Sequence, residues 1–231
     1  MEPCTPDSGV RPDPAPRSRI TLGILAGGLA TRLGGVDKAW LERGGVPQVL
    51  RRAAELQGAN GVGFTTVLVS ANRNEAAYAR HGLRAVRDVR TDPVGPLAGL
   101  EALAAVAATD WLLTVPVDLV ALPPDTVDRL WAARSGNGSF AIDSDGPQPL
   151  VALWRVAALR PAVRDAIAAR EHAVASLGSR LGLSRAVFSD AVFGNLNTPA
   201  ELAAVGVRGH APAAPAGAPP GGSHSGRILP P

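Results

Sequence analysis

The chain has 231 residues, of which 46% are hydrophobic and 4% aromatic, and its formal net charge at pH 7 is +3. Two of the positive charges, Arg208 and Arg227, lie in the C-terminal tail, so only about +1 remains elsewhere, which excludes the basic surface of a nucleic-acid-binding protein. The one cysteine, Cys4, excludes disulfides and cysteine-ligated metal sites within the chain.

Both ends of the chain are rich in Pro, Gly, Ala and Ser and lack hydrophobic periodicity. Such segments bury too little apolar surface to offset the entropy of ordering them. We therefore predict disordered tails at residues 1–18 and 208–231, and a single domain at residues 19–207. Because no run approaches the roughly 18 apolar residues of a membrane span and no signal peptide is evident, we expect a cytoplasmic protein that binds no membrane.

Apolar runs of strand length alternate with longer, alanine-rich helical patterns through residues 19–207. The expected strands are residues 20–25, 66–70, 84–86, 111–115, 140–142 and 150–154. The expected helices are residues 47–57, 75–80, 96–107, 125–133, 156–170, 174–181 and 199–205. This alternation predicts an α/β fold, a three-layer α/β/α sandwich around a mostly parallel, Rossmann-like sheet.

Ligands of such sheets bind beyond the carboxyl ends of the strands. This rule selects four places in the chain: the loop after Leu25, the segment after Ser70, Asp88 after the third strand, and Asp118 after the fourth. We expect these four places to converge on one side of the domain.

The loop after Leu25 reads LAGGLATRLGGVDK and contains the one lysine among 23 Lys and Arg residues. It matches neither the P-loop nor the dinucleotide-binding fingerprint. Gly27 and Gly28 allow a ligand to approach the backbone closely, and exposed loop amides form an anion-binding concavity. Arg32 and Lys38 add positive charge, so the loop predicts a phosphate site. The alternative is a mobile surface loop with incidental cations.

Two aspartates follow expected strands. Asp118 comes after the apolar run WLLTVPV, where a carboxylate suits Mg²⁺, which binds one or two carboxylates together with phosphate oxygens and water. Its alternative role is a helix cap or a loop residue. Asp88, which has Asp92 nearby, is a candidate ligand contact; the alternative is a surface ion pair with Arg87 or Arg90.

Two further motifs lie near helix starts. The segment GPLAG, residues 95–99, turns the chain into a helix whose N-terminal amides favour an anion, although a purely structural helix start would look the same. In NLNTP, Asn195 and Asn197 are candidates to contact the second substrate or Mg²⁺. The alternative is that Asn197 caps the helix beginning at Pro199. The four histidines lack catalytic or metal-binding spacing.

These motifs resemble those of a known family. LAGGLATRLGGVDK is similar to the signature of nucleotidyltransferases that activate a phosphorylated metabolite. Asp37, where sugar-phosphate members usually have proline, resembles the molybdenum cofactor guanylyltransferases. Further matches follow in order over nearly the whole predicted domain: SANR at residues 70–73, RD ending at Asp88, GPLAG, PVD ending at Asp118 and NLNTPAEL at residues 195–202.

The resemblance implies a nucleotidyltransferase fold and roles for particular residues. The nucleotide-binding residues would be Leu25, Ala26, Gly27, Gly28, Lys38, Asp88 and Asp118. The catalytic residues would be Arg32, Lys38 and Asp118, with Asp118 ligating Mg²⁺. Asn195 and Asn197 would contact the second substrate or the metal. The family often has a nucleotide-contacting asparagine where this chain has Ser70, and Asn72 is a candidate replacement.

The resemblance also implies the reaction: GMP is transferred from GTP to the terminal phosphate of molybdenum-bound molybdopterin, which releases pyrophosphate and forms the guanine dinucleotide cofactor. GTP, molybdopterin and Mg²⁺ would be bound, with transient contacts to other proteins of molybdenum cofactor metabolism. Two alternatives remain at this point. The same chemistry could use CTP or another phosphorylated acceptor such as a sugar phosphate, or the chain could be a nucleotide-binding regulatory module without turnover.

Overall fold

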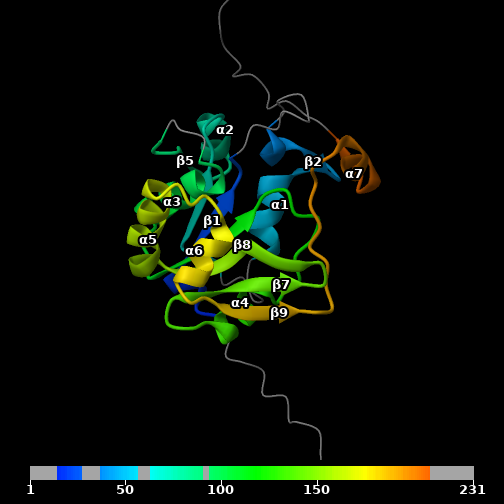
Figure 1. Cartoon of the computed structure of the whole chain (residues 1–231). Helices are drawn as coiled ribbons and strands as arrows, with labels where there is room; N and C mark the ends of the chain where they lie inside the picture. The colour runs from blue at the N-terminus through cyan, green and yellow to red at the C-terminus, as the bar shows by residue number, and fades with distance from the viewer. Residues whose placement is uncertain (1–14, 28–36, 57–62, 91–93, 209–231) are drawn as a thin grey trace, which may run out of the picture.

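The computed structural model describes residues 15–27, 37–56, 63–90 and 94–208. Its centre is a seven-stranded sheet, and a small three-stranded sheet lies beside it (Figure 1). The strands are β1 Ile20–Leu25, β2 Glu42–Arg43, β3 Val46–Pro47, β4 Thr66–Ser70, β5 Arg84–Val86, β6 Trp111–Pro116, β7 Gly138–Asp143, β8 Gly146–Arg155, β9 Ser184–Phe188 and β10 Val207–Arg208. The helices are α1 Gln48–Glu55, α2 Glu75–Arg80, α3 Pro96–Val106, α4 Thr126–Ala133, α5 Val156–Ala168, α6 Val174–Arg180 and α7 Pro199–Ala204, with 3-10 turns η1 Arg17–Arg19 and η3 Lys38–Trp40.

The strand order of the large sheet is β5-β4-β1-β6-β8-β7-β9. Strands β5, β4, β1 and β6 are mutually parallel, β8 is antiparallel to both β6 and β7, and β9 is parallel to β7. The predicted mostly parallel sheet is therefore confirmed. The central strands β1 and β6 are buried on both faces, which explains why their sequences are near-continuous apolar runs.

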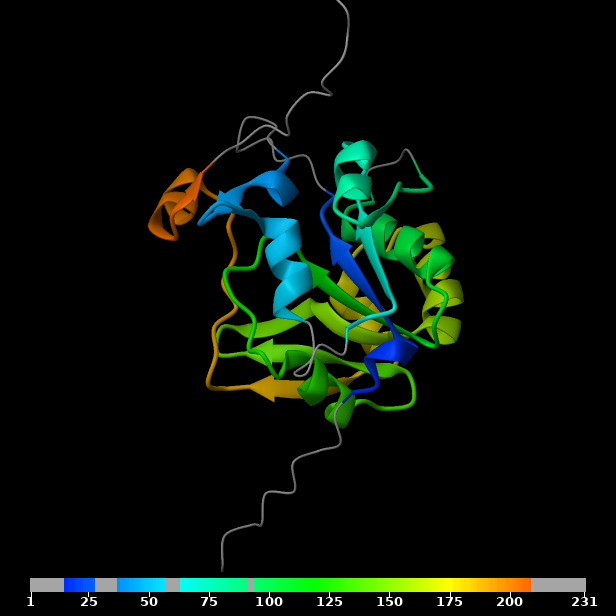
Figure 2. The same ribbon diagram turned by 180° about the vertical axis from the view of Figure 1, so that it is seen from behind.

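Helices cover both faces of the sheet (Figures 1 and 2). One core lies between the sheet and α1, α2 and α4, and includes Ile24 and Leu113. The second core lies between the sheet and α3, α5 and α6, and includes Leu103 and Trp154. The predicted three-layer α/β/α sandwich is thus confirmed. In the described part of the chain, no helix combines the length and the hydropathy needed to cross a membrane.

Every expected strand and helix is present, with small differences at the ends. The prediction missed β9, whose sequence SRAVF buries only Ala186 and Phe188 at the edge of the sheet. It also missed the two-residue strands β2, β3 and β10, which form the small sheet. A two-residue strand has too few positions to show an alternating pattern.

The predicted N-terminal tail is wrong for residues 15–18, which pack on the domain. The Ala15 amide donates to Asp128 Oδ1 at 2.8 Å, and the Arg17 side chain, only 5% exposed, pairs with the same carboxylate at 3.2 Å. Arg17 Nε also donates to the Leu56 carbonyl. A side chain that finds these partners is buried despite the polar sequence around it. Residues 1–14 and 209–231 lie outside the described residues, and Arg208 belongs to β10.

Gly23 lets α3 pack closely on the central strand β1. A Cβ built at Gly23 would lie 2.9 Å from Leu103 Cδ1 and 3.1 Å from Leu112 Cδ1, both inside the core. We expect Gly23→Ala to lower the free energy of unfolding by about 1–3 kcal/mol, because the added methyl overpacks this contact. Urea denaturation measures the change. Gly136→Ala is the matched control, since its Cβ would meet nothing within 4 Å; an equal loss in both variants would contradict the packing argument.

Candidate active site

The carboxyl ends of β5, β4, β1 and β6 lie along one edge of the sheet, because these strands are parallel. Figure 2 shows this edge at the top, together with η3, α7 and α2. Backbone hydrogen bonds join the segments that leave the strands: the Ala26 amide donates to the Ser70 carbonyl at 3.1 Å, and the Val117 amide donates to the Leu25 carbonyl at 3.0 Å. The predicted convergence at one edge is confirmed.

Lys38 brings together two residues that are far apart in the sequence. Its Nζ donates to Asp118 Oδ2 at 2.8 Å and to Asn197 Oδ1 at 2.8 Å. The Lys38 and Asp118 side chains are 21% and 24% exposed, so the pair is accessible to a ligand without being fully solvated. One cation is therefore held between two oxygen atoms at the carboxyl edge of the sheet.

The alternative that Asn197 caps helix α7 is wrong, because a capping box built from its neighbours performs that role. The Thr198 hydroxyl accepts from the Glu201 amide, and the Glu201 carboxylate accepts from the amides of Asn197 and Thr198. The hydrogen bonds from the backbone amides of Asn197 and Thr198 lower the pKa of Glu201, and the bond from Asn197 has the larger effect. The carboxamide of Asn197 is thus directed to Lys38 instead of to α7.

The backbone after Asp118 is fixed by neighbouring segments. The Leu196 amide donates to the Asp118 carbonyl at 2.7 Å, and Asn195 forms a β-bridge with Leu119. Asn195, a predicted site residue, therefore contributes through its backbone. The Val120 carbonyl accepts from Arg43 Nη1 at 3.0 Å. These contacts tie the turn that carries Asp118 to two neighbouring segments of the fold.

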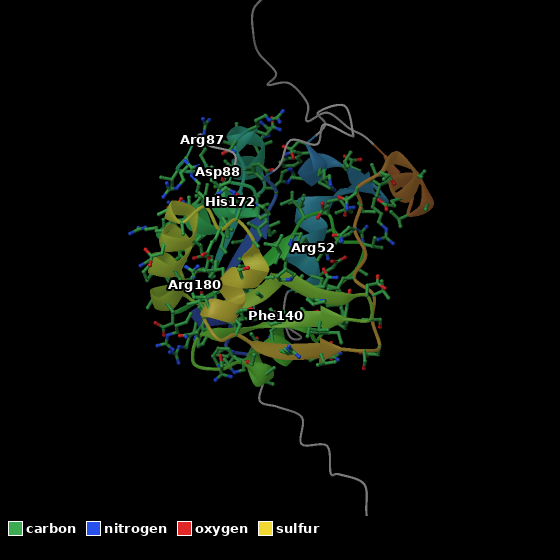
Figure 3. The ribbon with its side chains drawn as sticks, viewed as in Figure 1. Arg52, Arg87, Asp88, Phe140, His172 and Arg180 are labelled. Atoms are coloured by element: carbon green, nitrogen blue, oxygen red, sulfur yellow. The ribbon has the colours of Figure 1, made fainter. Side chains whose placement is uncertain are left out.

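Arg52, which the sequence did not indicate as a site residue, binds the carbonyl of Leu119 in the same turn. Arg52 belongs to α1 (Figure 3), and its side chain is fully buried. Its Nη2 donates to the Leu119 carbonyl at 2.6 Å, and its Nη1 binds Glu55. Burial lowers the pKa of Arg52, while the negative charges of Glu55 and Asp118 act in the opposite direction. The available signal was an arginine at helical spacing between the buried Val49 and Leu56.

Asp88 lies at the same edge but apart from Lys38. It follows β5, which is two strands from β1 and three from β6. Asp88 and Asn72 form a reciprocal pair, in which Asn72 Nδ2 donates to Asp88 Oδ2 at 2.8 Å and the Asp88 amide donates to Asn72 Oδ1 at 2.9 Å. The arginines considered as alternative partners bind glutamates: Arg87 binds Glu75 and Arg90 binds Glu101.

Ser70 lies beneath the start of the glycine loop and is only 1% exposed. A Cβ built at Gly99 would lie 2.5 Å from Ser70 Oγ and 3.1 Å from Leu25 Cδ2, and one built at Gly27 would lie 3.5 Å from Ser70 Oγ. The second glycine of GPLAG thus allows α3 to pack against the ends of β1 and β4. Of the remaining predicted site residues, Gly28 and Arg32 lie outside the described residues, as does Asp92.

The two oxygen atoms bound to Lys38 Nζ, one from a carboxylate and one from a carboxamide, are of the chemical type that Mg²⁺ prefers. Among the described residues, no group of three or more His, Cys, Asp or Glu side chains could hold a metal, so a site made only of such ligands is excluded there. Asp118 Oδ2 and Asn197 Oδ1 already surround one cationic nitrogen at 2.8 Å each. Mg²⁺ typically takes one or two carboxylates and completes its shell with phosphate oxygens and water.

Sequence comparison identifies relatives that span almost the same length. Residues 22–183 match the model of the MobA-like NTP transferase domain. A molybdenum cofactor guanylyltransferase of Serratia proteamaculans is 36% identical over 182 residues, covering 78% of this chain and 90% of the relative. Another, from Yersinia pseudotuberculosis, is 33% identical over 187 residues, covering 79% of this chain and 92% of the relative.

Solved structures share the fold at lower sequence identity. The molybdopterin-guanine dinucleotide biosynthesis protein A of Archaeoglobus fulgidus has a TM-score of 0.58 and 19% identity, covering 80% of this chain and 96% of its own. The 2-C-methyl-D-erythritol 4-phosphate cytidylyltransferase of Thermus thermophilus has a TM-score of 0.54 and 16% identity, covering 79% and 95%. Because proteins named for different nucleotides share this architecture, the fold alone does not select a substrate.

Proposed function

The chain belongs to the MobA-like NTP transferase family, and on this premise we propose that it transfers GMP from GTP to the terminal phosphate of molybdenum-bound molybdopterin. It is a nucleotidyltransferase, and its relatives are named molybdenum cofactor guanylyltransferases. The observation that carries the proposal is the Lys38–Asp118–Asn197 cluster at the carboxyl edge of the sheet. This cluster offers a phosphate-binding cation and metal-binding oxygens at one point.

The proposed reaction is a displacement at phosphorus. An oxygen of the acceptor phosphate forms a bond to the α-phosphorus of GTP, the bond from that phosphorus to the bridging oxygen of the β-phosphate breaks, and its electron pair leaves with pyrophosphate. The nucleophile is already anionic at neutral pH, so no general base is needed. Catalysis then depends on positioning and on neutralising charge. Lys38 supplies a compact positive charge for the departing phosphates.

Ligand binding requires the Lys38–Asp118 pair to exchange partners. The ammonium group of Lys38 moves from a carboxylate to phosphate oxygens, and the carboxylate of Asp118, with Asn197 beside it, becomes free to hold Mg²⁺. When bound, Mg²⁺ would neutralise phosphate charge as a Lewis acid. Either exchange alone leaves a partly buried charge without a partner, which is costly. We therefore propose that nucleotide and metal bind together.

The base and the reacting phosphates are proposed to lie at different points of the sheet edge. Strands are about 4.8 Å apart, so Asp88 next to β5 lies on the order of 14 Å along the edge from Asp118 next to β6, and Asn72 follows β4 between them. The backbone of Leu25, Ala26 and Gly27, at the end of β1, lies between these two points. A nucleotide lying along the edge would place its base near Asp88 and its phosphates near Lys38.

Titration calorimetry and a pyrophosphate-release assay test the proposed function. We expect GTP with Mg²⁺ to bind more tightly than CTP with Mg²⁺, and molybdenum-bound molybdopterin to trigger pyrophosphate release from GTP. Tighter binding of CTP would contradict guanylyl transfer and favour a cytidylyl donor. Binding of GTP without pyrophosphate release, with the acceptor present, would contradict transfer to this acceptor.

A further inference from the structure

A hydrogen bond joins the start of α2 to the residue immediately before Lys38. Asn74 Nδ2 donates to Asp37 Oδ2 at 2.8 Å, while Asp37 Oδ1 accepts from the Ala39 amide at 3.1 Å and so caps turn η3. Both carboxylate oxygens of Asp37 are therefore engaged. One holds the turn that carries Lys38, and the other ties this turn to a different part of the domain.

The backbone of Asn74 adopts a conformation that is unusual for a residue other than glycine. Its φ and ψ are 61° and 28°, in the left-handed region, and Arg170 is the only other described non-glycine residue with positive φ. Asn74 occupies the N-cap position of α2, where asparagine normally accepts a hydrogen bond from the helix. Here its side chain makes no capping bond. The left-handed backbone instead accompanies a side chain whose amide is bound to Asp37.

Trp40, the last residue of turn η3, also packs against α2 and the residue that follows it. The ring of Trp40 lies 5.0 Å from that of Tyr78 and 5.6 Å from that of His81, measured between centroids. Burial raises the pKa of Tyr78, and the nearby negative charge of Asp37 raises it further. Helix α2 thus holds residue 37 by a hydrogen bond and residue 40 by ring packing, and Lys38 lies between these two attachments.

We propose that Asn74 is a positioning residue that fixes Lys38 for phosphate binding. A 3-10 turn of three residues has poor hydrogen-bond geometry and does not hold its own orientation. Lys38 also has a long, flexible side chain, so a fixed backbone lowers the entropy lost when its ammonium group binds phosphate. This inference rests on the proposed role of Lys38 as the phosphate-binding cation.

The first test compares N74G with the matched control R170G. Glycine adopts positive φ freely in both variants, but only N74G removes the bond to Asp37. We expect N74G to lower kcat/KM for GTP about tenfold, the value expected for losing a hydrogen bond to a charged group, while the protein stays folded at the assay temperature by circular dichroism. R170G should keep the wild-type kcat/KM. Wild-type kcat/KM in folded N74G would overturn the proposal.

The second test exchanges the two side chains. N74D places one carboxylate against another and should lower kcat/KM at least as much as N74G. The double variant D37N/N74D restores a hydrogen bond with the donor and acceptor reversed, and the carboxamide oxygen introduced at position 37 can still accept from the Ala39 amide. We expect it to recover kcat/KM to within about threefold of wild type. A double variant no better than N74D would overturn the proposal.

Binding of inorganic tripolyphosphate separates this inference from the proposed function. This anion contains neither base nor acceptor, so its affinity reports on the phosphate site, which includes Lys38, and not on base or acceptor contacts. Wild-type protein should bind it about tenfold more tightly than N74G does, and R170G should match wild type. If pyrophosphate release from GTP failed while this difference held, the proposed reaction would be wrong and the role of Asn74 would stand. Equal affinities in wild type and N74G would reject the role of Asn74.

Discussion

Replacement of Lys38 by alanine is expected to reduce kcat/KM for GTP by roughly 10²- to 10³-fold, the range found when a single charge-stabilising group is removed from a reaction centre. The variant removes the cation that exchanges between Asp118 and the nucleotide phosphates. The fold should stay intact, because the Lys38 side chain is partly exposed and its two partners lie at the surface of the sheet edge. Steady-state pyrophosphate release and circular dichroism measure the two effects.

The same variant gives a result that does not depend on turnover. Without Lys38, the Asp118 carboxylate loses its ion-pair partner. We therefore expect Lys38→Ala to bind Mn²⁺ more tightly than wild type in the absence of nucleotide. Electron paramagnetic resonance measures this affinity. Arg19→Ala is the control, since it removes an exposed cation that pairs with Asp110 near the opposite end of the sheet. Unchanged kcat/KM in Lys38→Ala, or a matching loss in Arg19→Ala, would contradict the assignment.

Replacement of Asp118 by asparagine is expected to reduce turnover by roughly 10²- to 10³-fold. The two side chains have nearly the same shape, and the backbone bond from the Leu196 amide to the carbonyl of residue 118 is unaffected. The loss therefore reports on charge rather than on folding. Pyrophosphate release should be measured over a range of Mg²⁺ concentrations, and Mn²⁺ binding should be measured in the presence of GTP.

Asp110→Asn is the matched control for this variant. Asp110 immediately precedes β6, whereas Asp118 follows it. The Asp110 carboxylate forms an exposed ion pair with Arg19, and exposed ion pairs contribute little to stability. Its replacement should leave turnover and Mn²⁺ binding unchanged. If Asp118→Asn kept wild-type turnover at low Mg²⁺ concentration, Asp118 would not hold the metal.

Local pattern was sufficient for most of the fold. The strands at residues 20–25, 66–70 and 84–86 and the helix at residues 75–80 have the bounds that hydrophobic patterning predicts. Their order along the chain also predicted that the loop carrying Lys38 and the segment carrying Asp118 would converge on one side, because parallel strands end at the same edge of a sheet. For Asn197 the sequence predicted only a candidate contact with the second substrate or Mg²⁺, since an asparagine before a helix is equally consistent with capping; its bond to Lys38 was not predicted. Thr198 and Glu201 decided between the two by forming the cap themselves.

Residue type and short-range spacing were enough to predict the layered α/β architecture, the glycine loop with Lys38, and the aspartates that follow parallel strands. The side-chain contacts became visible in the folded chain alone: Asn74 with Asp37, Arg52 with the Leu119 carbonyl, and Asn72 with Asp88. These contacts link residues whose separation along the chain carries no periodic signal. For Arg52 the physical reason is burial, which requires a polar group to find a partner in the folded chain. The two asparagine contacts depend on which loops the fold brings together at the edge of the sheet.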